Sequence, residues 1–251
     1  MINSADAYSL DSIRYTKTHT VAIDPDALLD NRVVMGLHND PRADIFRVLR
    51  TNVLRQLREN NWNSFAITSA TPGAGKTFIS VNLAIAMAIE GNQSVLIVDA
   101  DLRRPSVGQY LGIEWDFGLV DCLEGNVPLA DALVKPDIER LVILPGKDSD
   151  SSASELISSR KMVNLIQEIK SRYEDRIIIF DIPPLFAGDE ALLFMPYIDA
   201  ALLVVEDGKN TSDQLQHAMY ILEQTNLLGL VVNKSRQSLP VYQYEYSGEA
   251  V

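Results

Sequence analysis

The chain has 251 residues, of which 47% are hydrophobic and 22% charged, so it can form the core of one globular α/β domain. Its formal net charge of −12 argues against broad nucleic-acid binding, which needs a basic surface. A single cysteine, Cys122, excludes a disulfide framework and a cysteine-rich metal site.

The first 39 residues are polar and show no strong periodicity, and we predict an N-terminal arm over residues 1–39 that is partly ordered at best. They lack the apolar core of a signal peptide. No run in the chain approaches the roughly 18–20 apolar residues that cross a bilayer. We therefore expect a cytoplasmic protein that reaches a membrane only through a partner.

A helix is predicted to begin at Asp40 as its N-cap, with Pro41 in its first turn. Apolar residues that recur every four positions predict its buried stripe: Ile45, Leu49, Val53 and Leu57. Arginines occupy other positions of the same helix: Arg42, Arg47, Arg50, Arg55 and Arg58. They indicate either a solvated face or a docking surface for an acidic patch on another subunit.

Residues 64–83 have the pattern of a buried strand, a glycine-bearing loop and a helix. The loop ATPGAGKT, residues 70–77, is a Walker A (P-loop) pattern that opens with Ala70 in place of the usual glycine. Small residues let successive backbone N–H groups curl around phosphates, which also face the positive end of the helix. A plain turn is the alternative, but the apolar residues on both sides favour the P-loop. The nucleotide-binding residues expected here are Thr71, Pro72, Gly73, Ala74, Gly75, Lys76, Thr77 and Phe78.

The rest of the chain alternates strands and helices. Apolar runs predict strands at 94–98, 141–144, 177–180, 201–205 and 228–232, and helical patterns cover 155–173 and 211–225. This order predicts an α/β three-layer sandwich of the P-loop NTPase type, with six or seven mostly parallel strands covered by helices on both faces. Residues 235–251 read as a flexible C-terminal tail that carries Tyr242, Tyr244 and Tyr246.

Three carboxylates follow two of these strands: Asp99, Asp101 and Asp181. Ligands of an open parallel sheet bind beyond the carboxyl ends of its strands. Asp181 suits the Walker B role and, with Thr77 and Asp99, is a predicted Mg²⁺ ligand. Asp99 and Asp101 lie two residues apart and so can share a face. Either of them could accept the proton of an attacking tyrosine hydroxyl, whose pKa is about 10.

The segments ATPGAGKT, VLIVDADLR and IIIFDIPP together resemble the motifs of the bacterial tyrosine kinases (BY-kinases) of capsule and exopolysaccharide synthesis. The resemblance covers about residues 40–246 and suggests the free-standing cytosolic branch, with a kinase domain at 40–234. It implies that Mg-ATP phosphorylates the tail tyrosines of a neighbouring subunit in a ring. It also implies recruitment to the inner face of the cell membrane by an embedded polysaccharide co-polymerase that activates the kinase, and a cognate tyrosine phosphatase.

The resemblance assigns roles residue by residue. The catalytic set would be Lys76, Asp99, Asp101, Arg103 and Asp181, and Asn233 would contact the adenine. The family's oligomerisation pattern ExxRxxR corresponds to Asp44, Arg47 and Arg50, with Asp in place of Glu.

Two other functions remain open. Partition and division-site ATPases share the P-loop, but they carry an extra lysine at the position that Thr71 occupies here. The second is a nucleotide-dependent scaffold that binds ATP and a membrane partner and transfers nothing, in which case the tail tyrosines would have no role.

Overall fold

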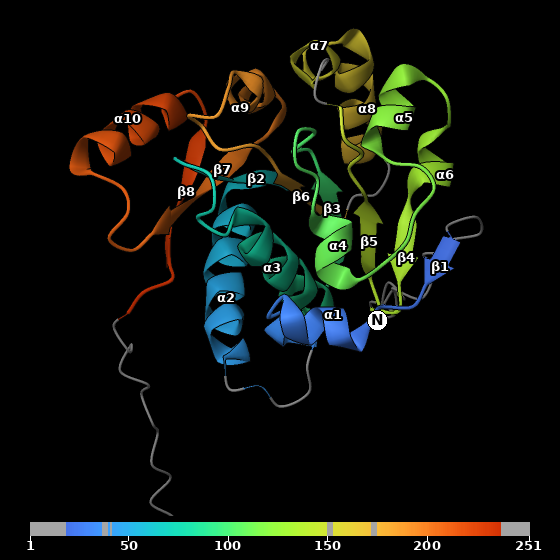
Figure 1. Cartoon of the computed structure of the whole chain (residues 1–251), viewed down its shortest axis with the longest axis horizontal. Helices are drawn as coiled ribbons and strands as arrows, with labels where there is room; N and C mark the ends of the chain where they lie inside the picture. Colours follow the sequence, from blue (N-terminus) through green and yellow to red (C-terminus); the bar gives the residue numbers. More distant parts are fainter. Residues whose placement is uncertain (1–18, 37–39, 41, 150–152, 172–174, 237–251) are drawn as a thin grey trace, which may run out of the picture.

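A computed structural model describes residues 19–36, 40, 42–149, 153–171 and 175–236. Within these ranges an eight-stranded sheet lies between two layers of helices (Figure 1). Its strand order is β1-β4-β5-β3-β6-β2-β7-β8, and every pair is parallel except β4 with β5. The predicted three-layer α/β fold is therefore confirmed. None of the helices in these ranges has the length and apolar character needed to cross a membrane.

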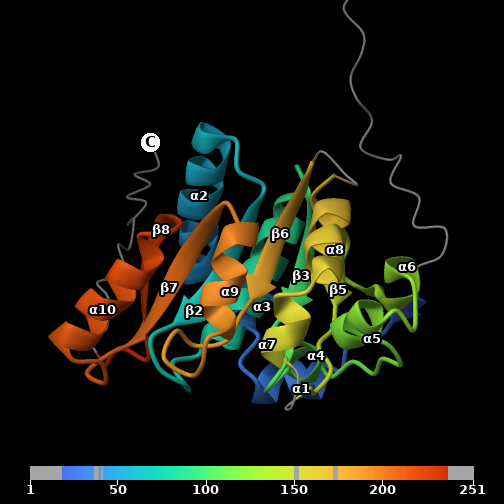
Figure 2. The same ribbon diagram turned by 90° about the horizontal axis from the view of Figure 1, so that it is seen from above.

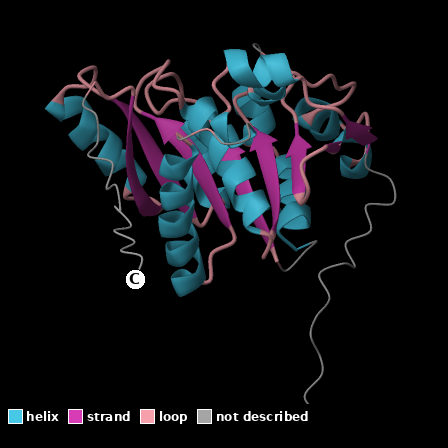
Figure 3. Ribbon diagram, turned by 90° about the horizontal axis from the view of Figure 1, so that it is seen from below, coloured by secondary structure: helices cyan, strands magenta, loops and turns pink. Residues whose placement is uncertain are grey.

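Six strands, β5, β3, β6, β2, β7 and β8, run in one direction and end along one edge of the sheet (Figure 3), whereas β1 and β4 run the opposite way. The strands are β1 (His19–Val21), β2 (Ser64–Ser69), β3 (Ser94–Asp99), β4 (Val134–Pro136), β5 (Leu141–Leu144), β6 (Arg176–Asp181), β7 (Ala200–Glu206) and β8 (Asn226–Asn233). The sequence predicts six or seven strands and misses β1 and β4, because three residues are too few to show a period.

The helices divide between the two faces of the sheet (Figure 2). One face carries α1 (Pro25–Asp30), the 3-10 helix η2 (Val34–Gly36), α2 (Ala43–Asn60), α3 (Lys76–Glu90) and α4 (Val107–Leu111). The other face carries α5 (Leu119–Glu124), α6 (Leu129–Ala132), α7 (Ala153–Ile157), α8 (Arg160–Ser171), α9 (Glu190–Phe194), the 3-10 helix η3 (Met195–Tyr197) and α10 (Ser212–Leu222). The helix predicted over 155–173 is thus two helices, and the hydroxyl of Ser159 accepts the N–H of Met162 where the second begins.

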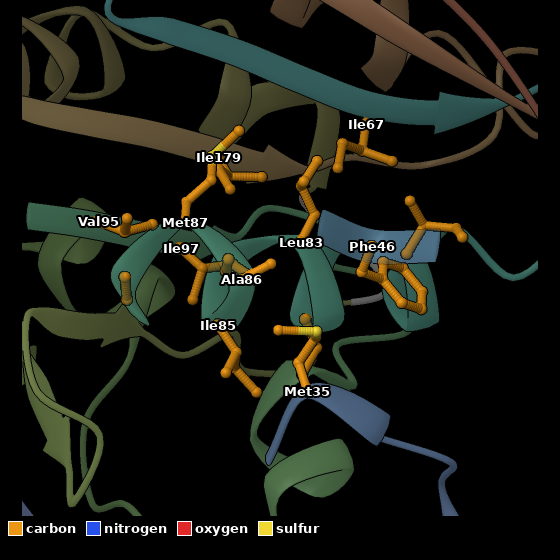
Figure 4. Close-up of a cluster of buried hydrophobic side chains, with 14 of the residues drawn as sticks. Met35, Phe46, Ile67, Leu83, Ile85, Ala86, Met87, Val95, Ile97 and Ile179 are labelled. Carbon is orange, nitrogen blue, oxygen red and sulfur yellow. The ribbon is translucent and has the colours of Figure 1, made fainter. Parts of the chain in front are cut away.

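The core beneath α3 explains why the P-loop helix is fixed in place. Figure 4 shows Leu83 and Met87 of α3 packed among side chains of the sheet, with Phe46 of α2 alongside. This helix is apolar nearly all round, as expected for a helix buried between the sheet and other helices. Each fully buried side chain of this size contributes roughly 1.5–3 kcal/mol, so the helix start is held rigidly at the sheet edge.

The buried face of α2 differs from the predicted stripe. Val53 and Leu57 are buried and Leu49 is half-buried, but Ile45 is 58% exposed. An α-helix has 3.6 residues per turn, so residues spaced strictly by four drift around its surface. The buried face of α2 therefore combines spacings of three and four residues. Its buried members are Ala43, Phe46, Val53, Leu54 and Leu57. The helix also begins later than predicted, at Ala43, and the Asp40 carboxylate accepts the N–H of Arg42 just before it.

The N-terminal segment also departs from its prediction as an arm. Residues 19–36 pair β1 with β4 and bury Val33, Val34 and Met35 in the core. Asp24 caps α1, which has Pro25 in its first turn. The apolar clusters here are short, and long-range pairing rather than local periodicity orders them. The rest of the predicted arm, residues 1–18 and 37–39, lies outside the described residues.

Candidate functional site

The loop between β2 and α3 folds as the P-loop pattern requires. Gly73 and Gly75 have φ angles of 83° and 92°, in the left-handed region that favours glycine. A Cβ atom at Gly75 would lie 2.3 Å from Nδ2 of Asn233. Both glycines are therefore needed for the backbone to turn here.

The strand-end carboxylates converge on the first turn of α3. Asp99 and Asp181 are paired across the adjacent strands β3 and β6. Nζ of Lys76 lies 2.8 Å from Asp101 and 3.5 Å from Asp181. The hydroxyl of Thr77 donates to Asp181 over 2.6 Å, and Ser80 donates to its other oxygen over 3.1 Å. The structure thus brings together Lys76 and the three aspartates that the motifs single out.

The buried acidic and basic groups are unbalanced in number, with three carboxyl groups around one ammonium group. Burial would lower the pKa of Lys76, but the negative charges of Asp181 and Asp101 outweigh it and raise that pKa above its usual value. Burial raises the pKa of Asp181, against the opposing effect of Lys76 and of the Thr77 hydroxyl. The site therefore carries an excess of negative charge that a cation can neutralise.

Asp99 and Asp101 have different surroundings. One oxygen of Asp99 accepts the backbone N–H groups of Ser106 and Val107 over 2.7 and 2.8 Å. Its other oxygen, Oδ1, is buried and has no hydrogen-bond partner. Burial and then the charge of Asp181 raise the pKa of Asp99 to about 8. Asp101, in contrast, lines the open cavity beside the P-loop.

That cavity has a volume of about 480 Å³. Its lining comes from the P-loop and from the segments after β3 and β6: Pro72, Gly73, Gly75, Lys76, Thr77, Asp101, Arg103, Arg104, Ser106, Tyr110, Pro183, Pro184 and Ala187. Arg103 is held by the carboxylate of Glu190, which is only 1% exposed. Sequence reasoning misses Glu190, Ser106 and Tyr110, because no motif spacing marks them.

Several predicted nucleotide contacts lie outside the cavity wall. Phe78 packs edge-to-face on Phe46, with ring centroids 5.6 Å apart. Asn233 donates from Nδ2 to the carbonyl of Ala74 over 2.8 Å. Thr71 receives a hydrogen bond from Asn210 on its hydroxyl. These side chains shape the loop from outside. The three tail tyrosines lie outside the described residues.

The predicted oligomerisation residues of α2 do not form one outward-facing group. Arg47 forms an ion pair with Asp44 of its own helix. Arg50 turns inward and donates to the carbonyl of Ala86 on α3 over 3.3 Å. Only Asp44 and Arg47 of this set are well exposed.

The donor set at the strand ends fits Mg²⁺. It offers oxygen atoms only, and the buried Oδ1 of Asp99 lacks a partner. Among the described residues no group of three His, Cys, Asp or Glu side chains could hold a metal ion by itself. Mg²⁺ typically needs only one or two carboxylates, with water and substrate phosphate supplying the other ligands.

Comparison with known proteins finds relatives among P-loop NTPases and tyrosine-protein kinases. The ParA family described as NUBPL iron-transfer P-loop NTPase matches residues 61–247. The tyrosine-protein kinase YwqD of Bacillus subtilis (strain 168) is 30% identical over 210 residues, which cover 83% of this chain and 87% of that protein. The putative tyrosine-protein kinase CapB of Staphylococcus aureus is 28% identical over 218 residues, covering 85% and 94%. The crystal structure of the chimerical protein CapA2B2 superposes with a TM-score of 0.76 at 30% identity, covering 86% of this chain and 93% of that one.

Proposed function

Because the chain belongs to the P-loop NTPases and, among them, to the bacterial tyrosine-protein kinases, we propose that it transfers the γ-phosphoryl group of Mg-ATP to tyrosines of its own C-terminal tail. The acceptors are Tyr242, Tyr244 and Tyr246, supplied by a neighbouring subunit. The enzyme is thus a protein-tyrosine kinase whose product is its own phosphorylated form.

One observation carries this proposal beyond nucleotide binding. Asp101 lines the cavity and touches Lys76, although Asp181 already bonds Thr77. A second carboxylate beside the phosphate loop suits a reaction that must remove a proton from an acceptor hydroxyl. In that reaction the bond from the γ-phosphorus to the bridging oxygen breaks, the bond to the tyrosine oxygen forms, and the Asp99/Asp101 pair takes the proton.

The remaining groups neutralise charge and orient the phosphates. Bound Mg²⁺ would supply charge neutralisation at the phosphates, held by Thr77, Asp99 and Asp181. Lys76 is placed to contact the phosphate chain, and Arg103 is fixed at the cavity wall by Glu190. These roles follow from position and charge.

The biological setting of the proposal is exopolysaccharide or capsule polymerisation and export. A membrane-embedded co-polymerase would recruit the cytoplasmic kinase to the inner face of the membrane, and a tyrosine phosphatase would reverse the modification. Phosphorylated tails add negative charge to an already acidic chain, which favours disassembly of a ring.

Phosphotyrosine analysis of purified protein incubated with Mg-ATP tests the reaction. We expect tail phosphorylation in the wild type and none in Lys76→Met. Simultaneous change of the three tail tyrosines to Phe should remove most of the signal, whereas Tyr220→Phe, at a 67% exposed tyrosine of α10, should leave it. A signal that persists in the triple variant contradicts the acceptor assignment. ATP binding without any phosphotyrosine would favour the scaffold.

Light scattering of unphosphorylated protein tests the ring. The double variant Arg47→Ala with Arg50→Ala should reduce assembly, and Arg55→Ala, an exposed arginine of the same helix, is the control. Unchanged assembly of the double variant would remove the basis for a ring built on α2.

A further inference from the structure

Four consecutive carbonyl groups of the P-loop, those of residues 71–74, accept hydrogen bonds from side chains. The hydroxyl of Ser69 donates to the carbonyl of Thr71 over 2.9 Å. The next three carbonyls are bound by residues that follow β7 or end β8: Pro72 by Lys209 at 3.2 Å, Gly73 by Lys234 at 2.7 Å, and Ala74 by Asn233 at 2.8 Å. Residues far along the sequence therefore hold three consecutive peptide groups of the loop.

Glu206, at the end of β7, ties the two lysines together. Its carboxylate lies 3.0 Å from Nζ of Lys209 and 3.2 Å from Nζ of Lys234. The side-chain hydrogen bond from Lys209 lowers the pKa of Glu206 below its usual value. The carboxylate therefore stays ionised at neutral pH and holds both ammonium groups beside the loop.

Fixing these carbonyls also fixes the neighbouring N–H groups. In a trans peptide the C=O and the N–H of the next residue point in opposite directions. Anchoring the carbonyls of Pro72, Gly73 and Ala74 outward turns the N–H groups of Gly73, Ala74 and Gly75 the other way. Among the described residues none of these three N–H groups makes a well-aligned backbone hydrogen bond. A donor on the carbonyl also polarises the peptide and strengthens its N–H as a donor.

The backbone of Lys234 adopts an unfavourable conformation in order to make these contacts. Its φ angle is 57°, in the left-handed region that a lysine rarely adopts. Its N–H donates to Oδ1 of Asn233 over 2.9 Å, while its Nζ reaches Gly73. Such strain persists only where surrounding contacts over-determine the conformation.

We propose that Lys209, Asn233 and Lys234, tied by Glu206, form a carbonyl clasp whose role is to aim three P-loop N–H groups at the phosphates of the nucleotide. They are positioning residues, acting through the loop. The inference rests on the proposed nucleotide binding and goes beyond it, because it assigns phosphate affinity to residues outside the cavity wall. Lys209 and Lys234 could instead contact the phosphates directly. Removing the negative charge of Glu206 distinguishes the two possibilities, because it should weaken phosphate binding only if the lysines act through the loop.

Calorimetric titration of the full chain with Mg-ADP and with adenosine tests the clasp. Lys234→Met should raise the Kd for Mg-ADP about tenfold, equivalent to about 1.4 kcal/mol. Glu206→Ala should raise it similarly, although removing a negative charge near the phosphates would by itself tighten anion binding. Adenosine affinity should not change in either variant, and Lys234→Arg should restore most of the Mg-ADP affinity.

Lys161→Met is the matched control, because Lys161 donates to a backbone carbonyl, that of Glu124, over 2.8 Å on a surface away from the cavity. Melting without nucleotide checks that each variant is folded. Tighter or unchanged Mg-ADP binding by Glu206→Ala, or unchanged binding by Lys234→Met, overturns the clasp alone. A wild type that does not bind Mg-ADP overturns the proposed function and the clasp with it.

Discussion

Asp99→Asn is expected to stabilise the nucleotide-free protein, and to do so more strongly as the pH rises. Asp99 is 1% exposed, and one of its carboxylate oxygens has no partner. Burial and the charge of Asp181 raise its pKa from 3.8 to about 8. Asparagine can accept the same N–H groups of Ser106 and Val107 and never ionises.

The sign and size follow from proton linkage. A carboxyl whose pKa is raised on folding binds its proton more tightly in the folded state. Below about pH 4 both states are protonated and the group has no effect on stability. From about pH 4 to pH 8 only the unfolded state loses the proton, so each pH unit can lower the folding constant tenfold. At pH 7 the cost is on the order of 4 kcal/mol, which the substitution removes.

Urea unfolding of wild type and Asp99→Asn between about pH 5 and pH 8 measures this difference. Asp148→Asn, in an exposed loop, is the control and should show a small, flat difference. A stability difference for Asp99→Asn that stays constant with pH, or a variant less stable than wild type at the alkaline end, refutes the reasoning. Tail phosphorylation by Asp99→Asn should fall at the same time, since functional sites commonly trade stability for activity.

Three further substitutions probe contacts that stabilise the fold. Thr77→Val removes the hydroxyl that bonds the buried carboxylate of β6 and should cost about 1–3 kcal/mol in urea unfolding; Thr77→Ser should retain that stability, and a Val variant as stable as wild type would contradict the contact. Gly118→Ala would place a Cβ atom 2.6 Å from the backbone oxygen of Pro145, so Tm should fall by at least about 2 °C, and an unaltered Tm would show that the loop yields freely. Asp199 has a lowered pKa because hydrogen bonds, including one from Lys170, outweigh its burial; its contribution is present above about pH 4 and is lost on acidification, so the deficit of Asp199→Asn should shrink in acid, and a pH-independent deficit would count against it.

The P-loop geometry and the carboxylates that converge on it could be predicted from the sequence, because they depend on local pattern and on one topological rule. The spacing of Gly73, Gly75 and Lys76 specifies the loop, and the parallel sheet brings Asp99 and Asp181 to one edge. The longer central strands could also be predicted, because a strand buried on both faces, such as β3, appears in the sequence as a continuous apolar run.

The remaining contacts depend on residues far apart in the chain. Lys209 and Lys234 reach a loop more than a hundred residues earlier, and no motif marks them. Glu190, at the start of α9 after β6, forms an ion pair with Arg103, which follows β3. The inward orientation of Arg50 could not be predicted either. Its partner is the backbone carbonyl of Ala86 on α3, and no side-chain pattern marks a backbone carbonyl.

The position of β2 has a consequence for how the protein is made. Ser64 pairs with Ile178 of β6, and Ser69 with Val204 of β7, so both neighbours of this strand are synthesised more than a hundred residues after it. Pairings of such long sequence separation form slowly and late. The strand that leads into the P-loop therefore has both neighbours only once β7 has been synthesised, and a nascent chain that lacks β7 cannot form the β2–β7 pairing beside that loop.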